Sequence, residues 1–182
     1  MVINDINKSK GVEMVKKKSY TTAGKVWRLA LCVAVPLLVG GLSALLTSSA
    51  MMKFGELNQP FLAPPAWLFP VAWTILYILM GLASYYIFMG GERGSKRDKE
   101  ISRSALVVYG IQLALNFAWS LIFFNLRWYW PALVWLVVMW AMIVILIVKA
   151  HKVSKPAMWM LIPYILWATF ASYLNLMIAI LN

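Results

Sequence analysis

The stretch Pro131–Ala150 reads PALVWLVVMWAMIVILIVKA, and its single charged residue, Lys149, lies beside its end. About 20 predominantly apolar residues suffice for an α-helix to cross ~30 Å of hydrocarbon, since each residue adds about 1.5 Å. A lysine near a helix end can extend its ammonium group to the membrane surface. The stretch therefore predicts a transmembrane helix.

Four further apolar runs of this kind cover residues 27–49, 68–90, 104–124 and 156–181, and their only charge is Arg28, close to the start of the first run. The chain is 63% hydrophobic, whereas soluble domains are about 45–50% apolar. The runs lack the alternation of barrel strands, and a helix satisfies its own backbone polar groups in lipid. The predicted fold class is an all-α membrane protein, a bundle of five transmembrane helices over residues 26–182.

The first run has a competing interpretation as a signal peptide, because Ser48-Ser49-Ala50 resembles a cleavage site. Its apolar core, Leu29–Leu46, is longer than the about 7–15 residues of a signal peptide's apolar region. The run is therefore expected to stay in the membrane. Residues 1–25 are polar and rich in lysine, and we expect them to form a disordered cytoplasmic tail.

The net charge of +11 comes from basic residues that flank the apolar runs, which argues against a nucleic-acid partner. Lysine and arginine gather in the amino-terminal tail and around residues 93–103 and 149–155, while the other side holds only Lys53 and Arg127. Basic loops stay in the cytoplasm. The sequence thus predicts a cytoplasmic amino terminus and an external carboxyl terminus, in a protein of the bacterial cell (inner) membrane.

Candidate reactive groups are sparse. The one cysteine, Cys32, lies inside an apolar run, and the one histidine, His151, lies in a basic loop. The sequence holds no nucleophile–base pattern, no metal-ligand spacing and no phosphate-binding glycine loop, so we expect neither a metal nor a required cofactor. Intramembrane charges, which mark ion and proton pathways, are missing too, and this disfavours an ion-coupled pump.

The third run carries a row of polar side chains, Gln112, Asn116 and Ser120, at every fourth position. Residues with this spacing share one face of a helix. An amide in a membrane needs a hydrogen-bonding partner, so we expect this row to face the interior of the bundle.

A second row on the same run consists of small residues, Gly110, Ala114 and Ala118. It is offset from the polar row by two residues, about 200° of rotation at ~100° per residue. Small residues at this spacing allow two helix backbones to approach closely. The row is predicted to face another helix, as the interface of a homodimer.

Aromatic residues repeat on the second and fifth runs, and the first connection contains Pro60, Pro64 and Pro65. Core packing is one explanation of the aromatic rows, and an apolar pocket with few polar groups, as in small-molecule sites, is the other. The loop is either a rigid connector or a lid over a cavity. The rows are Phe69, Trp73 and Tyr77 on the second run and Pro163, Trp167, Phe170 and Ala171 on the fifth.

Several of these residues belong to ordered motifs that run from about Val35 to the end of the chain. The chain resembles the translocator protein / tryptophan-rich sensory protein family, also called the peripheral-type benzodiazepine receptor family. The motifs are Pro64-Pro65, Trp73-Thr74-Ile75-Leu76-Tyr77, Met80-Gly81, Gln112-Leu113-Ala114-Leu115-Asn116, Trp119, Phe123-Phe124, Pro163-Tyr164-Ile165-Leu166-Trp167, Phe170-Ala171 and Leu174-Asn175.

The resemblance implies five helices, dimers, and a cavity for porphyrins, sterol-like lipids and synthetic isoquinoline or benzodiazepine ligands. It implies protoporphyrin IX or a haem-like tetrapyrrole as the ligand, with Trp73 and Trp167 as catalytic residues if porphyrin is degraded in light and oxygen. The ligand is expected between helices two, three and five, toward the outer side and under the proline-stiffened loop. The ligand-binding residues are expected to be Trp73, Tyr77, Asn116, Trp119, Trp167, Phe170 and Ala171.

Two positions depart from the family pattern. Leu62 replaces the tryptophan that commonly precedes the double proline, and no basic residue follows Tyr173 in the last run. Sterol binding is therefore not expected from the resemblance, since such patterns are weak even when complete. A tetrapyrrole-binding receptor or sensor, a photo-oxidative enzyme and a transporter of small lipophilic molecules all remain open.

Overall fold

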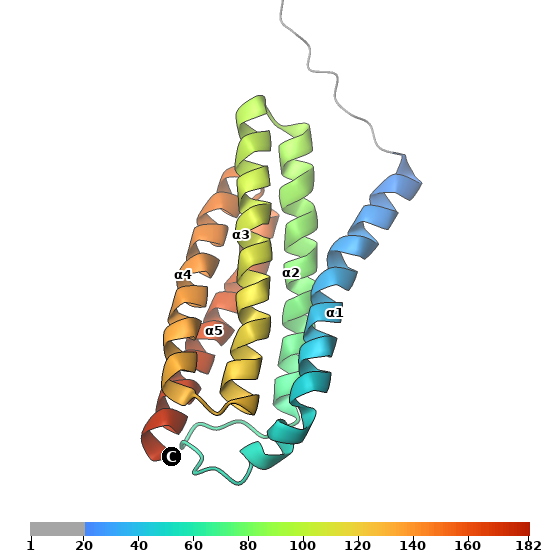
Figure 1. Ribbon diagram of the computed structural model, residues 1–182. Helices are drawn as coiled ribbons and strands as arrows, with labels where there is room; N and C mark the ends of the chain where they lie inside the picture. The colour runs from blue at the N-terminus through green and yellow to red at the C-terminus, as the bar shows by residue number, and fades with distance from the viewer. Residues whose placement is uncertain (1–20) are drawn as a thin grey trace, which may run out of the picture.

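The computed structural model describes residues 21–182, so most of the predicted basic tail over residues 1–25 lies outside the described residues. Within them the chain forms five long helices, each long and apolar enough to cross a membrane (Figure 1). The predicted fold class, a five-helix membrane bundle, is confirmed. The helices are α1 (Thr22–Phe54), α2 (Leu68–Arg93), α3 (Lys96–Ser120), α4 (Tyr129–Val153) and α5 (Lys155–Leu181), and a π-helical turn, η1 (Leu121–Asn125), continues α3.

Most helices extend beyond the apolar runs from which they were predicted, and α3 shows why. It begins at Lys96 rather than near residue 104. The apolar run did not include its first turns because they are charged. A capping box fixes this start: the Ser95 hydroxyl accepts from the Asp98 backbone N–H (3.3 Å), and the Asp98 carboxylate accepts from that of Ser95 (2.8 Å). Hydropathy reports the segment inside the membrane, whereas the cap determines where the helix begins.

Helices α2 to α5 share a closely packed interior, with α5 behind α2, α3 and α4 in Figure 1. This region contains large side chains with no exposed surface, whereas α1 buries only Pro36, Ser43 and Thr47. α1 lies along α2 and leans away from it toward the end of the bundle where α2 joins α3 (Figure 1). The fully buried large apolar residues of the interior include Met80, Ile87, Leu136, Met139, Ile143, Leu146, Leu161 and Ile178.

Two glycines allow α1 and α2 to approach closely. A Cβ atom on Gly81 of α2 would lie 2.6 Å from the Cα of Val33 and 2.7 Å from the carbonyl oxygen of Cys32. One on Gly40 of α1 would overlap the ring of Tyr77. Because the atoms facing Gly81 belong to the backbone, they cannot move aside as a side chain can. These contacts fix the position of α1 against the bundle.

The π-helical turn changes the direction of the chain between α3 and α4. The Leu126 N–H donates to the carbonyl of Leu121 (3.1 Å), and the Trp128 N–H to that of Ile122 (3.2 Å). Arg127, which lies between these two residues, has a positive φ of 54°. No other non-glycine residue within 21–182 has a positive φ. This left-handed conformation is unfavourable for residues that carry a side chain, and the residues that adopt it concentrate at functional sites.

Candidate functional site: a cavity beneath the first loop

The loop of residues 55–67 crosses one end of the bundle, called here the loop end, and hydrogen bonds hold it to α5 (Figure 1). The Asn58 N–H donates to Oδ1 of Asn182 (3.0 Å), and Nδ2 of Asn182 donates to the carbonyl of Asn58 (3.2 Å). Nδ2 of Asn58 also donates to the carbonyl of Leu181 (3.2 Å), and Nε2 of Gln59 donates to that of Phe54 (2.6 Å). Asn58 thus joins the loop to the end of α5, and Gln59 joins it to the end of α1.

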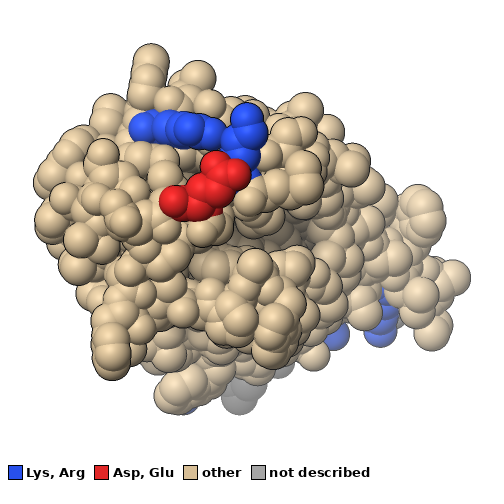
Figure 2. All heavy atoms as spheres, turned by 90° about the horizontal axis from the view of Figure 1, so that it is seen from below, with Lys and Arg blue, Asp and Glu red and all other residues tan. Residues whose placement is uncertain are grey.

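A cavity of about 710 Å³ lies beneath this loop. Its walls come from α1, the loop, the start of α2 and η1, and Figure 2 shows the loop end with a hollow in its surface. Small-molecule sites occupy about 300–1,000 Å³ and are lined mainly by apolar groups with a few polar ones. The lining fits this description; it includes Ala44, Met51, Met52, Phe54, Gln59, Pro60, Ala63, Pro64, Phe69 and Phe124.

Two smaller spaces adjoin the large cavity at Phe124. The first, about 220 Å³, lies between α1, α2 and α3, and the expected ligand-binding residues Trp73, Tyr77 and Trp119 line it. The second, about 30 Å³, is lined by Trp73, Trp119, Trp167 and Ala171. The three spaces thus lie next to one another, with the ring of Phe124 as a common wall.

The expected position of the ligand, between helices two, three and five, corresponds only to the 30 Å³ space. Aromatic packing fills that region: Trp73 stacks on Tyr77 of the same helix at 5.6 Å and meets Trp167 of α5 edge-on at 6.4 Å. The larger volume also lies under the proline-rich loop, but on the side of α1. Sequence periodicity located the aromatic rows but not the space beside them.

Asn116 belongs to a buried polar network that joins α2, α3 and α5. Its Oδ1 accepts from the Tyr77 hydroxyl (2.9 Å), and its Nδ2 donates to the Tyr164 hydroxyl (3.2 Å). Tyr164 in turn donates to Oε1 of Gln112 (2.6 Å). The polar row of α3 therefore faces inward, as predicted. Asn116 is only 1% exposed and lines none of the three spaces, so in this structure its amide joins helices rather than facing a ligand.

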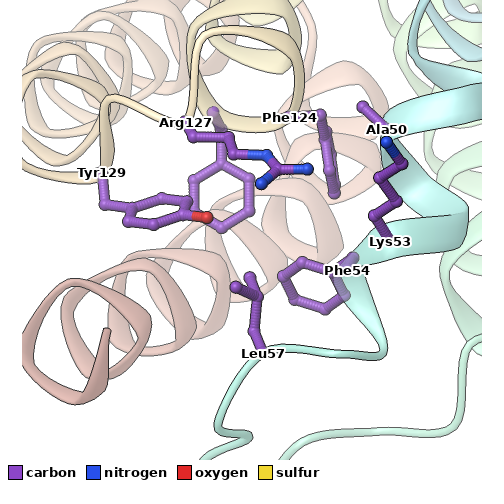
Figure 3. Close-up of a pocket in the computed structure, with 8 residues that line it drawn as sticks. Ala50, Lys53, Phe54, Leu57, Phe124, Arg127 and Tyr129 are labelled. Carbon is purple, nitrogen blue, oxygen red and sulfur yellow. The ribbon is translucent and has the colours of Figure 1, made fainter.

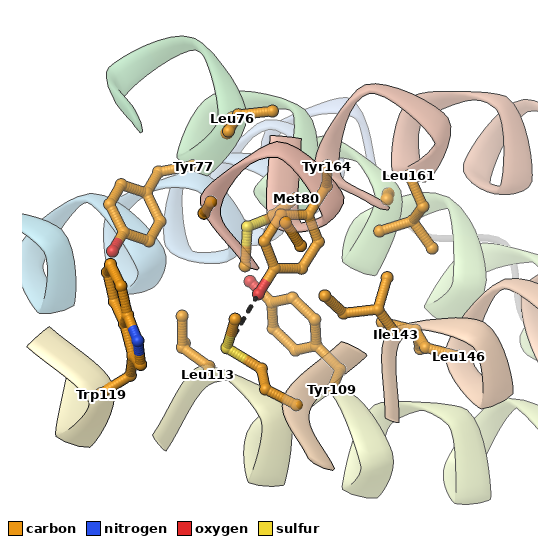
Figure 4. Close-up of a cluster of buried hydrophobic side chains, with 14 of the residues drawn as sticks. Leu76, Tyr77, Met80, Tyr109, Leu113, Trp119, Ile143, Leu146, Leu161 and Tyr164 are labelled. Carbon is orange, nitrogen blue, oxygen red and sulfur yellow. Dashed lines mark hydrogen bonds between the residues drawn. The ribbon is translucent and has the colours of Figure 1, made fainter. Parts of the chain in front are cut away.

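Tyr164 was not among the expected site residues, yet it is the central residue of this network. It has no exposed surface, and Figure 4 shows it with Tyr77 inside the buried cluster, a dashed line marking its 3.7 Å contact with the sulfur of Met139. The available signal was a tyrosine in the middle of a transmembrane run opposite two amides. A phenol there needs a partner, and the amide row of α3 provides one.

A second polar contact orients Trp119. Its indole N–H donates to Oδ1 of Asn175 (3.2 Å), whose Nδ2 donates to the carbonyl of Tyr129 (2.8 Å). Trp119 also stacks on Phe123 at 5.2 Å. This links α3, α5 and the start of α4 beneath the cavity.

The remaining expected residues fall into two groups. Trp167 and Ala171 line the smallest space, and the buried indole N–H of Trp167 has no partner within residues 21–182. Phe170 packs against Trp167 at 5.8 Å but lines none of the three spaces. Trp167 and Ala171 therefore contact the smallest space directly, whereas Phe170 contacts the ring of Trp167.

The small-residue row of α3 faces away from the bundle. Gly110 and Ala114 are exposed and Ala118 is half-buried. A Cβ atom on Gly110 would meet nothing within 4 Å. The row is therefore free for contact with another molecule, and the homodimer remains a prediction.

Five helices that are long and apolar enough to span a membrane define the class: a polytopic helical membrane protein, here with a cavity in the size range of small-molecule sites. The TspO/MBR family model matches residues 32–181. The chain is 38% identical over 159 residues to the tryptophan-rich protein TspO of Chlorobaculum tepidum, covering 87% of this chain and 98% of that protein.

Two further relatives extend the comparison. The tryptophan-rich sensory protein of Cereibacter sphaeroides is 35% identical over 133 residues, 71% of this chain and 78% of that protein. The translocator protein of Bos taurus is 36% identical over 147 residues, 78% of this chain and 82% of that protein. The chain belongs to the TspO/MBR family, as the sequence motifs indicated.

Proposed function

We propose that the protein is a membrane receptor or sensor that binds flat lipophilic ligands, with protoporphyrin IX or a haem-like tetrapyrrole as the expected ligand. The observation that carries this proposal is the cavity of about 710 Å³ beneath the loop, beside two smaller spaces that Trp73 and Trp167 help to line. An apolar ring system enters such a space by hydrophobic burial. Stacking on an aromatic side chain adds about 0.5–1.5 kcal/mol beyond burial.

A specific observation also favours light-driven porphyrin degradation as a second function. The rings of Trp73 and Trp167 lie 6.4 Å apart, and both line the innermost space. Two indoles beside a photoexcited ring are placed to exchange electrons with it. In this case Trp73 and Trp167 are the catalytic residues.

Purified protein mixed with protoporphyrin IX in darkness and in light tests both functions. Binding in darkness, read by quenching of tryptophan fluorescence, is expected for the receptor; loss of porphyrin absorbance in light and oxygen is expected only for the enzyme. Trp73→Phe with Trp167→Phe should retain dark binding with a modest change in affinity, and should abolish any light-driven loss.

Trp159→Phe is the matched control, because Trp159 is 67% exposed and lies near the start of α5, away from the cavity. Unchanged affinity and unchanged photochemistry in the double variant would reject this site. Absence of porphyrin binding by the unaltered protein would reject the proposed function.

We propose further that the loop end faces outward in the cytoplasmic membrane of a bacterium. The support is the distribution of basic residues, which favours a cytoplasmic position for the opposite end. In a Cys32→Ser background, Phe61→Cys in the loop should react with a membrane-impermeant thiol reagent on intact cells, and Lys96→Cys should not. The reverse pattern would contradict the orientation.

A further inference from the structure

Two cations lie near the mouth of the cavity. Of the lysine and arginine residues within 21–182, only Lys53 and Arg127 lie at the loop end, and both are exposed. Figure 2 shows basic and acidic atoms gathered at one edge of the hollow. The acidic residue on this side is Glu56, one turn after Lys53. The edge therefore carries a small net positive charge.

Lys53 and Arg127 line the same small pocket, together with Phe54, Phe124 and Tyr129. Figure 3 shows the guanidinium group of Arg127 extending across this pocket between Tyr129 and Phe124, with Lys53 on the opposite wall. The free volume is about 10 Å³, room for about one water molecule. Such a pocket fits one small polar group and excludes a ring system.

The pocket is a direct neighbour of the ligand cavity, because the rings of Phe54 and Phe124 line both. These rings contact each other at 5.6 Å. A ligand beneath the loop would thus lie on one side of this aromatic pair, with the two cations on the other side. A short flexible substituent at the edge of the ligand could reach them.

Within residues 21–182, neither of these two positive charges has an acidic partner. The ion pair between Lys99 and Glu92 lies at the other end of the bundle. Arg127 moreover adopts its position at a φ of 54°, an unfavourable conformation for a side chain with a Cβ atom. The π-helical turn and the hydrogen bond from Trp128 to Ile122 hold it there. Strained residues of this kind concentrate at ligand sites.

We propose that Lys53 and Arg127 form an anion subsite that binds a carboxylate of an amphiphilic ligand whose apolar body occupies the cavity beneath the loop. The inference rests on the proposed function and specifies its ligand class as flat lipophilic carboxylic acids. Arginine suits this role because its planar donors match both oxygens of a carboxylate. Glu56 opposes binding by like-charge repulsion.

The test compares protoporphyrin IX, which carries two carboxyl groups, with its dimethyl ester, which has the same ring and no free carboxyl group. Both are titrated into the full-length protein in phospholipid-free detergent, for the unaltered chain and for Lys53→Gln with Arg127→Gln. We expect the acid to bind the unaltered protein about tenfold more tightly than the ester, the size of effect expected from two exposed ion pairs. The double variant should lose this difference through weaker binding of the acid, with the ester unaffected.

Two single variants sharpen the result. Glu56→Gln should increase the preference for the acid, because it removes the opposing charge. Lys152→Gln removes one positive charge at the other end of the bundle and should leave the preference unchanged. Added salt should reduce the preference in the unaltered protein, since exposed charges are screened within about 10 Å at 0.1 M ionic strength.

Three outcomes would reject the subsite alone, and a fourth would reject the proposed function as well. Equal affinity of the unaltered protein for acid and ester rejects the subsite and leaves the proposed function standing. Equal weakening of both ligands in the double variant also rejects it. A retained acid preference, with loss of co-purified phospholipid phosphorus from the double variant, assigns the cations to lipid headgroups instead. Absence of binding of either porphyrin rejects the proposed function together with the subsite.

Discussion

The interior of α2 to α5 and the region between α1 and the loop differ sharply in packing. The interior is filled by side chains without exposed surface, and its polar groups bond to one another through Tyr164 and Asn116. α1 buries three of its 33 residues, and a cavity of about 710 Å³ lies beside it. Both regions are built from helices apolar enough to span a membrane, and the hydropathy of α1 falls within the range of the others, so hydropathy does not distinguish them.

The difference indicates a division of labour within the bundle. A membrane protein gains little from moving an apolar side chain out of lipid, so helices associate through close packing and hydrogen bonds. The interior has both, whereas α1 buries few residues and approaches the bundle closely at its glycine contacts with α2. The interior is thus suited to be the scaffold, and the α1 side to be the part that admits a ligand. The following predictions test this contrast.

The largest effect is expected where the two regions meet, at Gly81. A leucine there must displace the backbone of α1, since its Cβ alone would lie 2.6 Å from the Cα of Val33. Overpacking typically costs about 1–3 kcal/mol and occasionally more, and we expect Gly81→Leu to lower the free energy of unfolding by about 3 kcal/mol. Denaturation of the protein in mixed micelles measures it.

Gly41→Leu is the control for this substitution. A Cβ on Gly41 meets nothing within 4 Å, so the same change should leave stability the same or higher, in line with the low helix propensity of glycine. An equal loss of unfolding free energy for the two substitutions would show that the close approach of α1 and α2 does not hold α1 in place.

A smaller effect is expected inside the scaffold. Tyr164→Phe removes the hydroxyl that bonds Gln112 and Asn116, leaving two buried amides short of a partner. Buried hydrogen bonds in membrane proteins contribute about 0.6 kcal/mol on average and up to about 1.7, so we expect a loss of about 1–2 kcal/mol. Porphyrin affinity should change little.

Tyr173→Phe provides the comparison, because the Tyr173 ring stacks on Phe170 but its hydroxyl forms no hydrogen bond within residues 21–182. Its free energy of unfolding should equal that of the unaltered protein. If Tyr164→Phe is also as stable as the unaltered protein, the network does not hold the scaffold together.

The smallest effect concerns assembly, which we propose occurs through the outward row of Gly110, Ala114 and Ala118. Ala114→Phe should separate two facing helices and weaken dimerisation about tenfold, because small residues allow close backbone contact. Analytical ultracentrifugation in detergent reads the result. Ala141→Phe, at an exposed position on α4, should leave the dimer intact. An unchanged dimer in Ala114→Phe would assign the contact to another surface.

The sequence was sufficient to predict the five helices, since each contains a charge-free run close to the length of a membrane span. It also predicted that Gln112 and Asn116 face inward, because their spacing places them on one face of α3. The partners of those amides were not predictable from periodicity, since Tyr164 is far away in the chain and is brought near by the packing of α5 against α3. A lid over a cavity was one interpretation of the proline-rich loop, but the walls that α1 and η1 contribute to the cavity were not predictable from the sequence.

Filling the cavity tests the central claim most directly, that a ligand enters between α1, the loop and η1 rather than within the scaffold. Ala44 of α1 lines both larger spaces, so Ala44→Trp should occupy the cavity with little effect on folding; Ala141→Trp adds the same side chain on an exposed surface of α4. Titration with protoporphyrin IX in darkness should show at least about tenfold weaker binding for Ala44→Trp, and unchanged binding for Ala141→Trp. Unchanged affinity in Ala44→Trp would contradict the account, because it would place the ligand outside this cavity.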